Sequence, residues 1–307
     1  MNFCSDRCEA SLLKKMLFVM NPYAGMRKAN RYLADIIEVF NRADYEVITY
    51  MTAGPGDAAK AVRDRIQQVE LVVCAGGDGT FNETITGVLS SGVDVPIGYI
   101  PCGSTNDFAA SLKLSTNVVQ AAKDIAEGAP TRYDVGKFGD RYFSYVASFG
   151  AFTKASYSTP QNIKNALGHT AYILEGIQEL SQIRKEHVRI ELEDQVIEDD
   201  FLFGAISNST SVGGILTLDP KQVDMGDGMF ELLLVRAPRD LMELHECIWV
   251  LQKQKYNCAM LTFVGTQKLR ILPNPDMPWT LDGEREEGHE EICVENLHHA
   301  ISLMQRR

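Results

Sequence analysis

The residue types best suited to phosphate chemistry lie in one segment of this chain, Gly76-Gly77-Asp78-Gly79-Thr80-Phe81-Asn82-Glu83. Its glycines leave backbone N–H groups free of side chains, and the segment follows an apolar run and precedes an expected helix. Backbone N–H groups and the positive end of a helix both attract anions, so this turn predicts a phosphate site. The alternative is a plain tight turn in which Asp78 caps its own backbone, and this motif alone does not decide between the two.

Two further loops of small and polar residues support a phosphate site. They are Asn21-Pro22-Tyr23-Ala24-Gly25 and Gly103-Ser104-Thr105-Asn106-Asp107-Phe108-Ala109. Each follows a short apolar run directly, as the glycine segment does. The carboxyl ends of parallel strands meet at one edge of a sheet, where α/β proteins bind ligands. Three such loops at one edge therefore predict a shared binding site rather than three unrelated turns.

The elements that must position these loops are visible as an alternation of apolar runs and amphipathic stretches. The apolar runs are typical of strands buried on both faces and occur at 16–20, 47–50, 71–75 and 97–100. Between them, apolar side chains follow helical spacing from 33 to 40 and from 58 to 69. This order predicts right-handed crossovers and a mainly parallel sheet, which makes residues 14–130 an α/β domain.

After about residue 131 the pattern changes to alternation of apolar and polar residues, as at Val188, Ile190 and Leu192. Further strands are expected at 141–149, 201–207, 229–235, 260–264 and 269–271. The pattern predicts an antiparallel β-sandwich domain over residues 131–290, interrupted by helices at 163–183 and 241–251. We expect the last segment, 291–307, to pack back on the first domain.

Composition bounds the function. The chain is 45% hydrophobic and 23% charged, as in globular proteins, and its 30 Lys and Arg against 41 Asp and Glu give a net charge of −11. Such acidity excludes a general nucleic-acid binder and requires a local patch for any contact with an anionic membrane. No signal peptide and no apolar run of about 18 residues is visible. The seven scattered cysteines indicate reduced thiols and a cytoplasmic protein.

The three loops, together with Asp282-Gly283-Glu284 near the C-terminus, resemble the motifs of the diacylglycerol kinase catalytic family, which also includes sphingosine and ceramide kinases. The resemblance runs from about residue 16 to the C-terminus and is to the soluble bacterial members. The third loop has Ser104 where the family usually has threonine, which keeps the hydroxyl. The implied fold is an α/β domain similar to those of NAD kinase and phosphofructokinase, followed by an antiparallel β-sandwich domain.

The resemblance implies transfer of the γ-phosphoryl group of ATP to a lipid hydroxyl, with diacylglycerol as the expected acceptor and phosphatidic acid as the product. By the family pattern, Glu284 takes the proton from the attacking hydroxyl, supported by Asp282 and by Asp78 and Asp107 acting through Mg²⁺ and its waters. The residues implied to contact the nucleotide are Asn21, Pro22, Tyr23, Ala24, Gly25, Thr52, Gly76, Gly77, Asp78, Gly79, Thr80, Phe81, Asn82 and Ser104. These types suit the reaction, because phosphoryl transfer needs positioning, charge neutralisation and an oriented nucleophile.

A structural Mg²⁺ is also implied by the resemblance. In bacterial relatives it lies in an acidic, glycine-containing loop, which here is similar to Asp224-Met225-Gly226-Asp227-Gly228-Met229. Asp227 would be the side-chain ligand, with Asp224 and the carbonyl of Met229 nearby. The alternative is that both aspartates only form turns.

Other interpretations stay open at this point. Glu284 begins an acidic run, and such a run is usually a solvated face. NAD kinase and phosphofructokinase also have Gly-Gly-Asp-Gly loops, although the first and third loops here favour a lipid kinase. A nucleotide- or lipid-binding protein without turnover is expected to lack one of the acidic residues implied in catalysis. All four are present here, namely Asp78, Asp107, Asp282 and Glu284. A lipid substrate implies a cytoplasmic protein in transient, peripheral contact with the membrane. The sequence does not identify the lipid acceptor, and it neither indicates nor excludes a homodimer.

Overall fold

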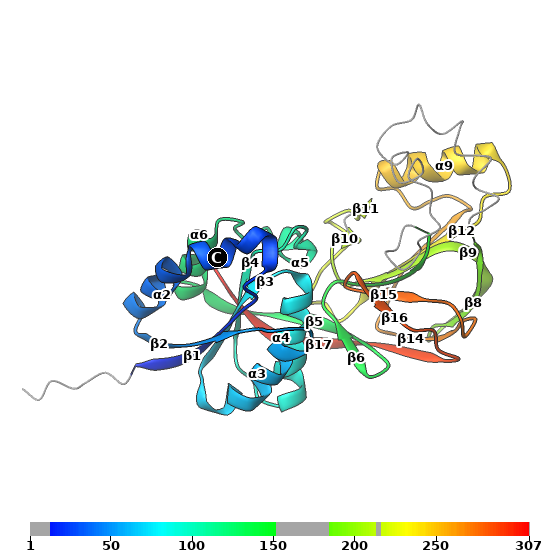
Figure 1. Cartoon of the computed structure of the whole chain (residues 1–307). Helices are drawn as coiled ribbons and strands as arrows, with labels where there is room; N and C mark the ends of the chain where they lie inside the picture. Colours follow the sequence, from blue (N-terminus) through cyan, green and yellow to red (C-terminus); the bar gives the residue numbers. More distant parts are fainter. Residues whose placement is uncertain (1–12, 152–183, 213–215, 307) are drawn as a thin grey trace, which may run out of the picture.

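The parallel sheet expected in the first part of the chain is present, with the strand order β2–β1–β3–β4. The computed structural model describes residues 13–151, 184–212 and 216–306 (Figure 1). The four strands are β1 (Lys14–Met20), β2 (Tyr45–Met51), β3 (Leu71–Gly76) and β4 (Ile97–Pro101). All neighbouring strands pair in parallel. Every residue of β3 and β4 is buried, which explains their unbroken apolar sequence.

Helices cover both faces of this sheet (Figure 1). They are α1 (Lys28–Arg31), α2 (Leu33–Arg42), α3 (Asp57–Arg65), α4 (Asp78–Ser91), α5 (Asp107–Ser111) and α6 (Val118–Ala126), with short 3₁₀ helices at Ala24–Arg27 and Ile66–Gln68. Alternate residues of a strand point to opposite faces. Accordingly, Leu17 and Val19 of β1 belong to one core cluster with residues of α3 and α4, while Met16 and Phe18 belong to another with residues of α2 and α6.

The second part of the chain is antiparallel, which confirms the expected fold class. Its strands are β5 (Ala129–Phe138), β6 (Arg141–Phe143), β7 (Val146–Gly150), β8 (Glu186–Glu191), β9 (Val196–Ser207), β12 (Phe230–Arg236), β13 (Leu261–Thr266), β14 (Lys268–Leu272), β15 (Trp279–Leu281) and β16 (Glu284–Glu286). A two-stranded ribbon joins β10 (Ser211–Val212) to β11 (Leu216–Thr217), and the helix expected at 241–251 is α9 (Leu241–Gln252). The helix expected at 163–183 lies outside the described residues.

The single strand expected at 141–149 is wrong in one respect, because β6 and β7 are separate strands. Between them the backbone N–H groups of Ser144 and Tyr145 donate hydrogen bonds to the carboxylate of Asp282. These donors are directed to a side chain instead of a neighbouring strand, so the strand is interrupted there.

The last strand, β17 (Ile292–Gln305), connects the two parts of the molecule. It pairs antiparallel with β14 and along most of its length with β5, and near its end Leu303 pairs in parallel with Ile97 of β4. In the described part of the chain, the parallel and antiparallel strands therefore form one hydrogen-bonded sheet of 15 strands. The sequence predicts the two strand types but not this continuity.

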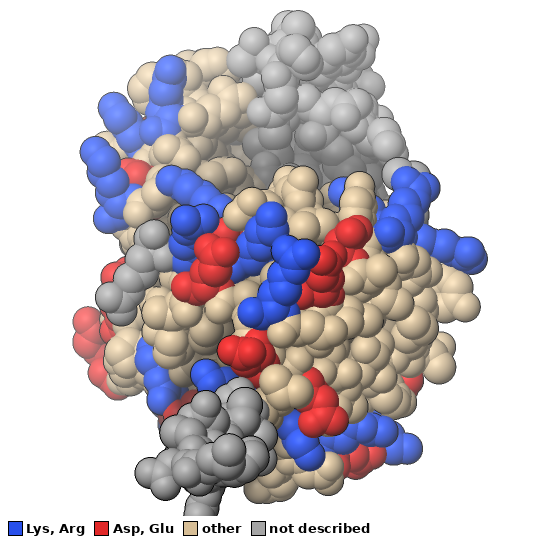
Figure 2. All heavy atoms as spheres, turned by 90° about the vertical axis from the view of Figure 1, so that its left-hand side faces the viewer, with Lys and Arg blue, Asp and Glu red and all other residues tan. Residues whose placement is uncertain are grey.

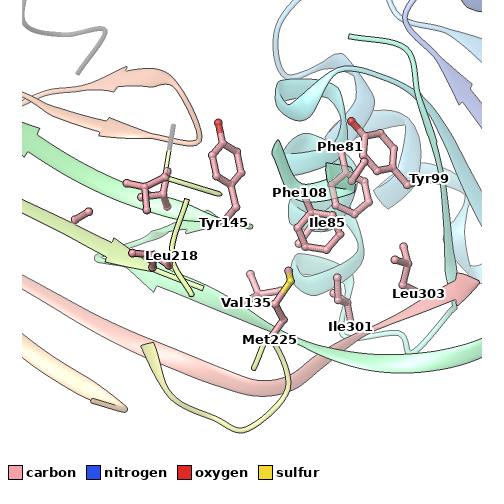
Figure 3. Packing of buried hydrophobic residues seen from close by; sticks show 14 of the residues in the cluster. Phe81, Ile85, Tyr99, Phe108, Val135, Tyr145, Leu218, Met225, Ile301 and Leu303 are labelled. Atoms are coloured by element: carbon pink, nitrogen blue, oxygen red, sulfur yellow. The ribbon is translucent and has the colours of Figure 1, made fainter. Parts of the chain in front are cut away.

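A buried cluster fills the junction of the two parts, as Figure 3 shows. Phe81 of α4 stacks on Tyr99 with ring centroids 4.2 Å apart and lies 4.7 Å from the ring of Phe108. The same cluster includes Tyr145 and Met225 from the antiparallel part. The junction is thus a hydrophobic core made of residues from both parts of the chain.

Positive charge is present locally despite the net charge of −11. Figure 2 views the end of the molecule that carries α2 and β2, where Lys and Arg side chains lie among Asp and Glu. Lys28, Arg31 and Arg42 of α1 and α2 are exposed. Within the described residues, no helix is long and apolar enough to cross a membrane.

Candidate active site

Three loops meet at the carboxyl ends of β1, β3 and β4, and glycine allows their backbones to touch. Gly25 has a φ of +51°, and a β-carbon there would lie 1.6 Å from the carbonyl oxygen of Cys102. A β-carbon on Gly103 would lie 2.6 Å from the Cα of Gly77. Any side chain at these positions would push the loops apart, so the glycines are needed for the close approach.

Hydrogen bonds fix these loops to one another. The side-chain amide of Asn21 donates to the hydroxyl of Thr80 at 3.3 Å, which joins the first loop to the start of α4. The backbone N–H of Cys102 donates to the carbonyl of Gly76 at 2.7 Å, which extends the pairing of β3 and β4 beyond the strands. Asn106, with a φ of 54°, accepts from the N–H of Gly103 at 2.8 Å. The loops are therefore ordered by contacts within the chain.

The loops form one wall of a cavity of about 400 Å³ between the parallel and antiparallel parts. Its lining residues from the loops are Asn21, Ala24, Gly25, Gly77, Asp78, Gly79, Thr80, Gly103, Ser104, Thr105 and Asp107. Those from the antiparallel part are Tyr145, Val146, Ser148, Phe203, Val212, Thr280, Asp282, Gly283 and Glu284. Because α4 begins at Asp78, its positive end and its first N–H groups face this space.

A second cavity of about 270 Å³ shares part of this lining. The shared residues are Asn21, Gly79, Thr80 and Glu284, and Tyr23, Thr52 and Glu83 line only the second cavity. The two cavities together make one groove that passes the N-terminus of α4. A ligand longer than a phosphate group can therefore occupy it.

Asp282 and Gly283 form the turn of the hairpin between β15 and β16, in which Leu281 pairs with Glu284. Their φ angles are +48° and +81°, and positive φ at both central residues favours an Asp-Gly sequence. The Asp282 carboxylate is buried and accepts five hydrogen bonds, from Asn82 Nδ2, Ser144 N, Ser144 Oγ, Tyr145 N and Val146 N. Burial raises the pKa of Asp282 above its usual value, and the hydrogen bonds act in the opposite direction.

This turn places Glu284 over the N-terminus of α4. One carboxylate oxygen of Glu284, Oε1, lies 2.9 Å from the position that a β-carbon on Gly79 would take. The other, Oε2, is 3.5 Å from the guanidinium of Arg141, which also pairs with Glu286. The side chain of Glu284 is 58% exposed, so its carboxylate is accessible from solvent where the two cavities meet.

Asp78 and Asp107 bring negative charge to the floor of the larger cavity. Burial, and then the charges of Asp107 and Asp282, raise the pKa of Asp78 to about 6. Among the described residues, its Oδ1 atom has no hydrogen-bond partner. Asp107 is also buried, and its Oδ1 accepts a hydrogen bond of 2.5 Å from the Ser211 hydroxyl. Charge repulsion combined with an unpaired buried oxygen is an arrangement that a cation relieves.

Four of the expected nucleotide contacts, Pro22, Gly76, Phe81 and Asn82, are absent from the linings of the two cavities. The Phe81 side chain is completely buried against Tyr99 and Phe108, so we correct its assignment from ligand contact to core residue. Gly76 is buried below the side chain of Thr80, and Pro22 is not part of either lining. Asn82 donates to the carbonyl of Tyr142 and to Asp282, which joins α4 to the antiparallel part.

The acidic loop 224–229 lies apart from this groove. Asp224 and Asp227 accept hydrogen bonds from the N–H groups of Gly226 and Met229, as in ordinary turns. However, burial and the nearby Asp227 raise the pKa of Glu231 to about 8. Within the described ranges, the buried Oε2 of Glu231 and Oδ1 of Asn296 have no hydrogen-bond partners, while Asn296 Nδ2 donates to the carbonyl of Met229. A buried oxygen without a partner is costly, so a cation or a water molecule at this loop would stabilise it.

Several residues that line the larger cavity could not be predicted as site residues from the sequence. Tyr145, Phe203 and Val212 come from the antiparallel part, where their alternation with other residues only indicates strands. Burial raises the pKa of Tyr145 well above its usual value, as do the charges of Asp282, Asp78 and Asp107. Arg141, which contacts Glu284, is separated from it by 143 positions. Only the fold brings these residues to the site.

The chain is similar in sequence to known proteins along most of its length. A family model described as the diacylglycerol kinase catalytic domain matches residues 15–138. The diacylglycerol kinase of Staphylococcus saprophyticus is 32% identical over 273 residues, which is 88% of this chain and 89% of that protein. The diacylglycerol kinase of Bacillus subtilis is 28% identical over 274 residues, covering 89% and 90% of the two chains.

Solved structures share the fold. The crystal structure of a diacylglycerol kinase from Bacillus anthracis superposes with a TM-score of 0.72 and 20% identity, covering 95% of this chain and 97% of that one. Another structure from the same organism gives a TM-score of 0.78 with 24% identity and 98% coverage of both chains. The arrangement of parallel and antiparallel parts is therefore shared with these proteins.

Proposed function

The chain belongs to the diacylglycerol kinase catalytic family, and from that premise we propose that it transfers the γ-phosphoryl group of ATP to the hydroxyl of diacylglycerol. The product is phosphatidic acid. The observation that carries this proposal is the position of Glu284, whose carboxylate lies at Gly79 over the first turn of α4 and lines both cavities. A carboxylate at that place can accept a proton from a hydroxyl that approaches a phosphate bound at the helix end.

The loops bind the nucleotide in this proposal. The N–H groups around Gly77, Gly79 and Gly103 are free of side chains, and together with the positive end of α4 they stabilise phosphate charge. Asn21 and Thr80 bound the adjoining cavity, which extends to Thr52 and has room for the rest of ATP. In this scheme the loops orient the phosphates, and Glu284 orients the acceptor hydroxyl.

A divalent ion fits the acidic floor of the site. Asp78 has an unpaired buried oxygen among the described residues and a raised pKa, and Asp107 lies beside it. We propose that these two carboxylates hold Mg²⁺ through its waters, because Mg²⁺ gives up its hydration shell reluctantly. When bound, Mg²⁺ neutralises charge on the transferred phosphate. Asp282 has a different role, because its hydrogen bonds direct it to Asn82 and to the backbone after β6, and it positions Glu284.

The other wall of the larger cavity suits a lipid acceptor. Tyr145, Val146, Phe203 and Val212 line it from the antiparallel part, opposite the polar loops. An acceptor with an apolar body and one hydroxyl can place its body against these residues and its hydroxyl near Glu284. Because such a lipid resides in a bilayer, the protein acts in transient contact with a membrane surface, as a peripheral cytoplasmic enzyme.

We also propose that the loop 224–229 binds a structural Mg²⁺. Asp227, Asp224 and the carbonyl of Met229 are the ligands implied by the family resemblance. Among the described residues, the buried oxygens Glu231 Oε2 and Asn296 Oδ1 lack hydrogen-bond partners, and Asn296 contacts the carbonyl of Met229. This ion would stabilise the loop, none of whose residues lines either cavity. The proposed ion is therefore tested by its effect on the thermal stability of the protein, not by enzyme turnover alone.

A lipid panel tests the proposed activity. Purified protein is incubated with Mg-ATP and with diacylglycerol, monoacylglycerol, sphingoid base or NAD as acceptor, and the phosphorylated product is measured by mass spectrometry. We expect phosphatidic acid to form fastest, and the Glu284→Gln variant to lower the signal by at least about 100-fold, which excludes a contaminating kinase. Faster phosphorylation of NAD than of every lipid, or no phosphorylation of any acceptor, would overturn the proposal.

A further inference from the structure

A bulge in β17 brings two histidines to the same side of a strand. The pairing register between β17 and β5 shifts between Leu297 and Ile301, and His299 has a φ of 53°. In a regular strand His298 and His299 would point to opposite faces. Here the left-handed conformation breaks the alternation, and the two imidazole rings stack with centroids 3.7 Å apart.

A buried carboxylate lies directly beside these rings. Asp134 of β5 is completely buried, and His298 Nδ1 is 3.3 Å from its Oδ1 atom. The N–H of His299 donates to the same oxygen at 2.7 Å, and the N–H of Gly228 donates to the other oxygen at 2.6 Å. One ligand atom from each of Asp134, His298 and His299 lies within 4.8 Å of the other two.

These three groups have the chemistry of a transition-metal site. Two imidazole nitrogens and one carboxylate oxygen are ligands that Zn²⁺ and similar first-row ions prefer, whereas Mg²⁺ prefers oxygen alone. The ligand atoms of a tetrahedral zinc ion lie about 3.3 Å apart, so small rotations of the imidazoles are enough to close the site. Both histidines are exposed, which gives an ion access from solvent, while the hydrogen bonds to Asp134 hold its carboxylate in place.

We propose that Asp134, His298 and His299 form a binding site for Zn²⁺ or a similar first-row divalent ion, with water completing the coordination. Its three ligands differ from the oxygen ligands proposed for the 224–229 loop, which lies beside it, since a β-carbon on Gly226 would be 3.8 Å from both His299 Nε2 and Asp224 Oδ1. The ion joins β5 to β17, the two strands that run through both parts of the sheet. It also bears on the neighbouring loop, because Asp134 accepts from Gly228 and a β-carbon on Gly228 would lie 3.0 Å from His298 Nδ1.

Titration of the chelator-treated full-length protein with Co²⁺ and Zn²⁺, in excess Mg²⁺, tests the site. We expect one equivalent of Co²⁺ to give visible absorption bands of nitrogen ligation, and one equivalent of Zn²⁺ to raise the thermal unfolding midpoint. His298→Ala and His299→Asn should each weaken Zn²⁺ binding by more than about tenfold, since even the loss of an orienting partner typically costs about 10- to 100-fold. Asparagine is chosen at position 299 because it tolerates positive φ.

Two control variants make the result specific. His187 also faces two carboxylates, of Asp200 and Glu198, but among the described residues it belongs to no cluster of three metal-ligating groups, so His187→Ala should bind Zn²⁺ like the parent protein. Asp227→Asn, in the acidic loop, should also retain Zn²⁺ binding. The proposal is overturned if the parent protein does not bind Zn²⁺ in excess Mg²⁺. It is equally overturned if both histidine variants fold, as judged by circular dichroism without metal, and bind Zn²⁺ unchanged, or if only Asp227→Asn loses binding.

Discussion

The side-chain amide of Asn82 donates a hydrogen bond of 2.6 Å to the carboxylate of Asp282, across 200 positions of sequence. Asn82 is in the second turn of α4, and Asp282 is in the hairpin turn that precedes Glu284. The bond therefore ties the helix whose N-terminus faces the larger cavity to the turn that carries the candidate base. Placement of Glu284 therefore involves a contact made by Asn82, which lines neither of the two cavities.

Replacement of Asn82 by alanine tests this dependence. Asn82→Ala removes one of five hydrogen bonds to a buried carboxylate, which should cost about 1–3 kcal/mol of unfolding free energy. Because Glu284 is then less well held, kcat should fall while the affinity for ATP changes little. Asn117→Ala is the control, since Asn117 caps the N-terminus of α6 and its loss also destabilises the fold, by about 1 kcal/mol. Equal kcat losses in the two variants would attribute the effect to stability and not to positioning.

Replacement of Glu284 by glutamine tests the base itself. Glutamine keeps the size of the side chain but cannot accept the hydroxyl proton, so kcat should fall by about 10²- to 10⁴-fold. The ATP affinity, measured by calorimetry, should stay within about twofold of the parent value, since the loops bind the nucleotide. Glu287→Gln alters an acid of the same run, with a side chain 83% exposed, and should leave kcat unchanged. An unchanged kcat in Glu284→Gln would show that this acidic run is only a solvated face.

The sequence predicts β1, β3 and β4 well because most of their residues are buried and appear as unbroken apolar runs, whereas β2, at the edge of the sheet, has no buried residue. The loops are predictable for a similar reason, since Gly77 and Gly103 are adjacent to strand ends whose mutual position follows from parallel pairing. Asp282 is different. Its motif indicates a catalytic acid, but five hydrogen bonds to residues at positions 82 and 144–146 give it a positioning role. Contacts over such sequence distances leave no periodic or local pattern.

Phe81 and β17 show two other limits of the sequence. Phe81 lies within a phosphate-binding motif, so motif matching assigns it to the ligand, whereas its helical position turns it into the core with Tyr99 and Phe108. In β17, strand periodicity is detectable but its partners are not, because pairing with β4, β5 and β14 depends on the global topology. Local sequence therefore predicts elements and motifs more reliably than it predicts which residues meet.

The contact between Gly77 and Gly103 predicts a sharp effect of a single methyl group. A β-carbon on Gly103 would lie 2.6 Å from the Cα of Gly77 and 2.7 Å from Asn106 Oδ1, so Gly103→Ala must separate two loops of the site. We expect ATP binding, measured by calorimetry, to weaken by at least about tenfold, the equivalent of 1.4 kcal/mol. Gly265→Ala is the matched control, because a β-carbon there meets only ordinary contacts in β13. Unchanged ATP affinity in Gly103→Ala would remove this loop contact from the binding site.

Stability measurements test the proposed Mg²⁺ in the loop 224–229. Millimolar Mg²⁺ should raise the thermal unfolding midpoint of the parent protein, since an ion that binds only the folded state stabilises it. Asp227→Asn should abolish most of this rise. Asp219→Asn changes another aspartate that accepts a turn hydrogen bond, from the N–H of Lys221, and should keep the Mg²⁺ effect. A Mg²⁺ effect that persists in Asp227→Asn would mean that Asp227 only forms a turn.

The raised pKa of Asp78 predicts that the ionised carboxylate of this cavity-lining residue destabilises the fold. Burial and the charges of Asp107 and Asp282 raise this pKa from 3.8 to about 6. Between these values the folded protein holds the proton more tightly than the unfolded chain, so ionisation of Asp78 lowers the free energy of unfolding as the pH rises through the window. Above pH 6 Asp78 is ionised in both states, and the free energy of unfolding is lowered by the full amount. A pKa shift of this size corresponds to about 1–3 kcal/mol.

Asp78→Asn, which removes the charge, should therefore stabilise the protein at pH 7 in the presence of a chelator while sharply lowering kcat. The gain should shrink as the pH falls below 6 and disappear below 3.8, where aspartate is protonated in both states. Chemical denaturation at several pH values measures this difference, with Asp276→Asn, at an exposed aspartate outside the site, as the control. Mg²⁺ should reduce the advantage of Asp78→Asn, because a cation relieves the same repulsion in the parent protein. If Asp78→Asn is less stable than the parent at pH 7, the carboxylate is held by favourable contacts and does not serve to bind a cation.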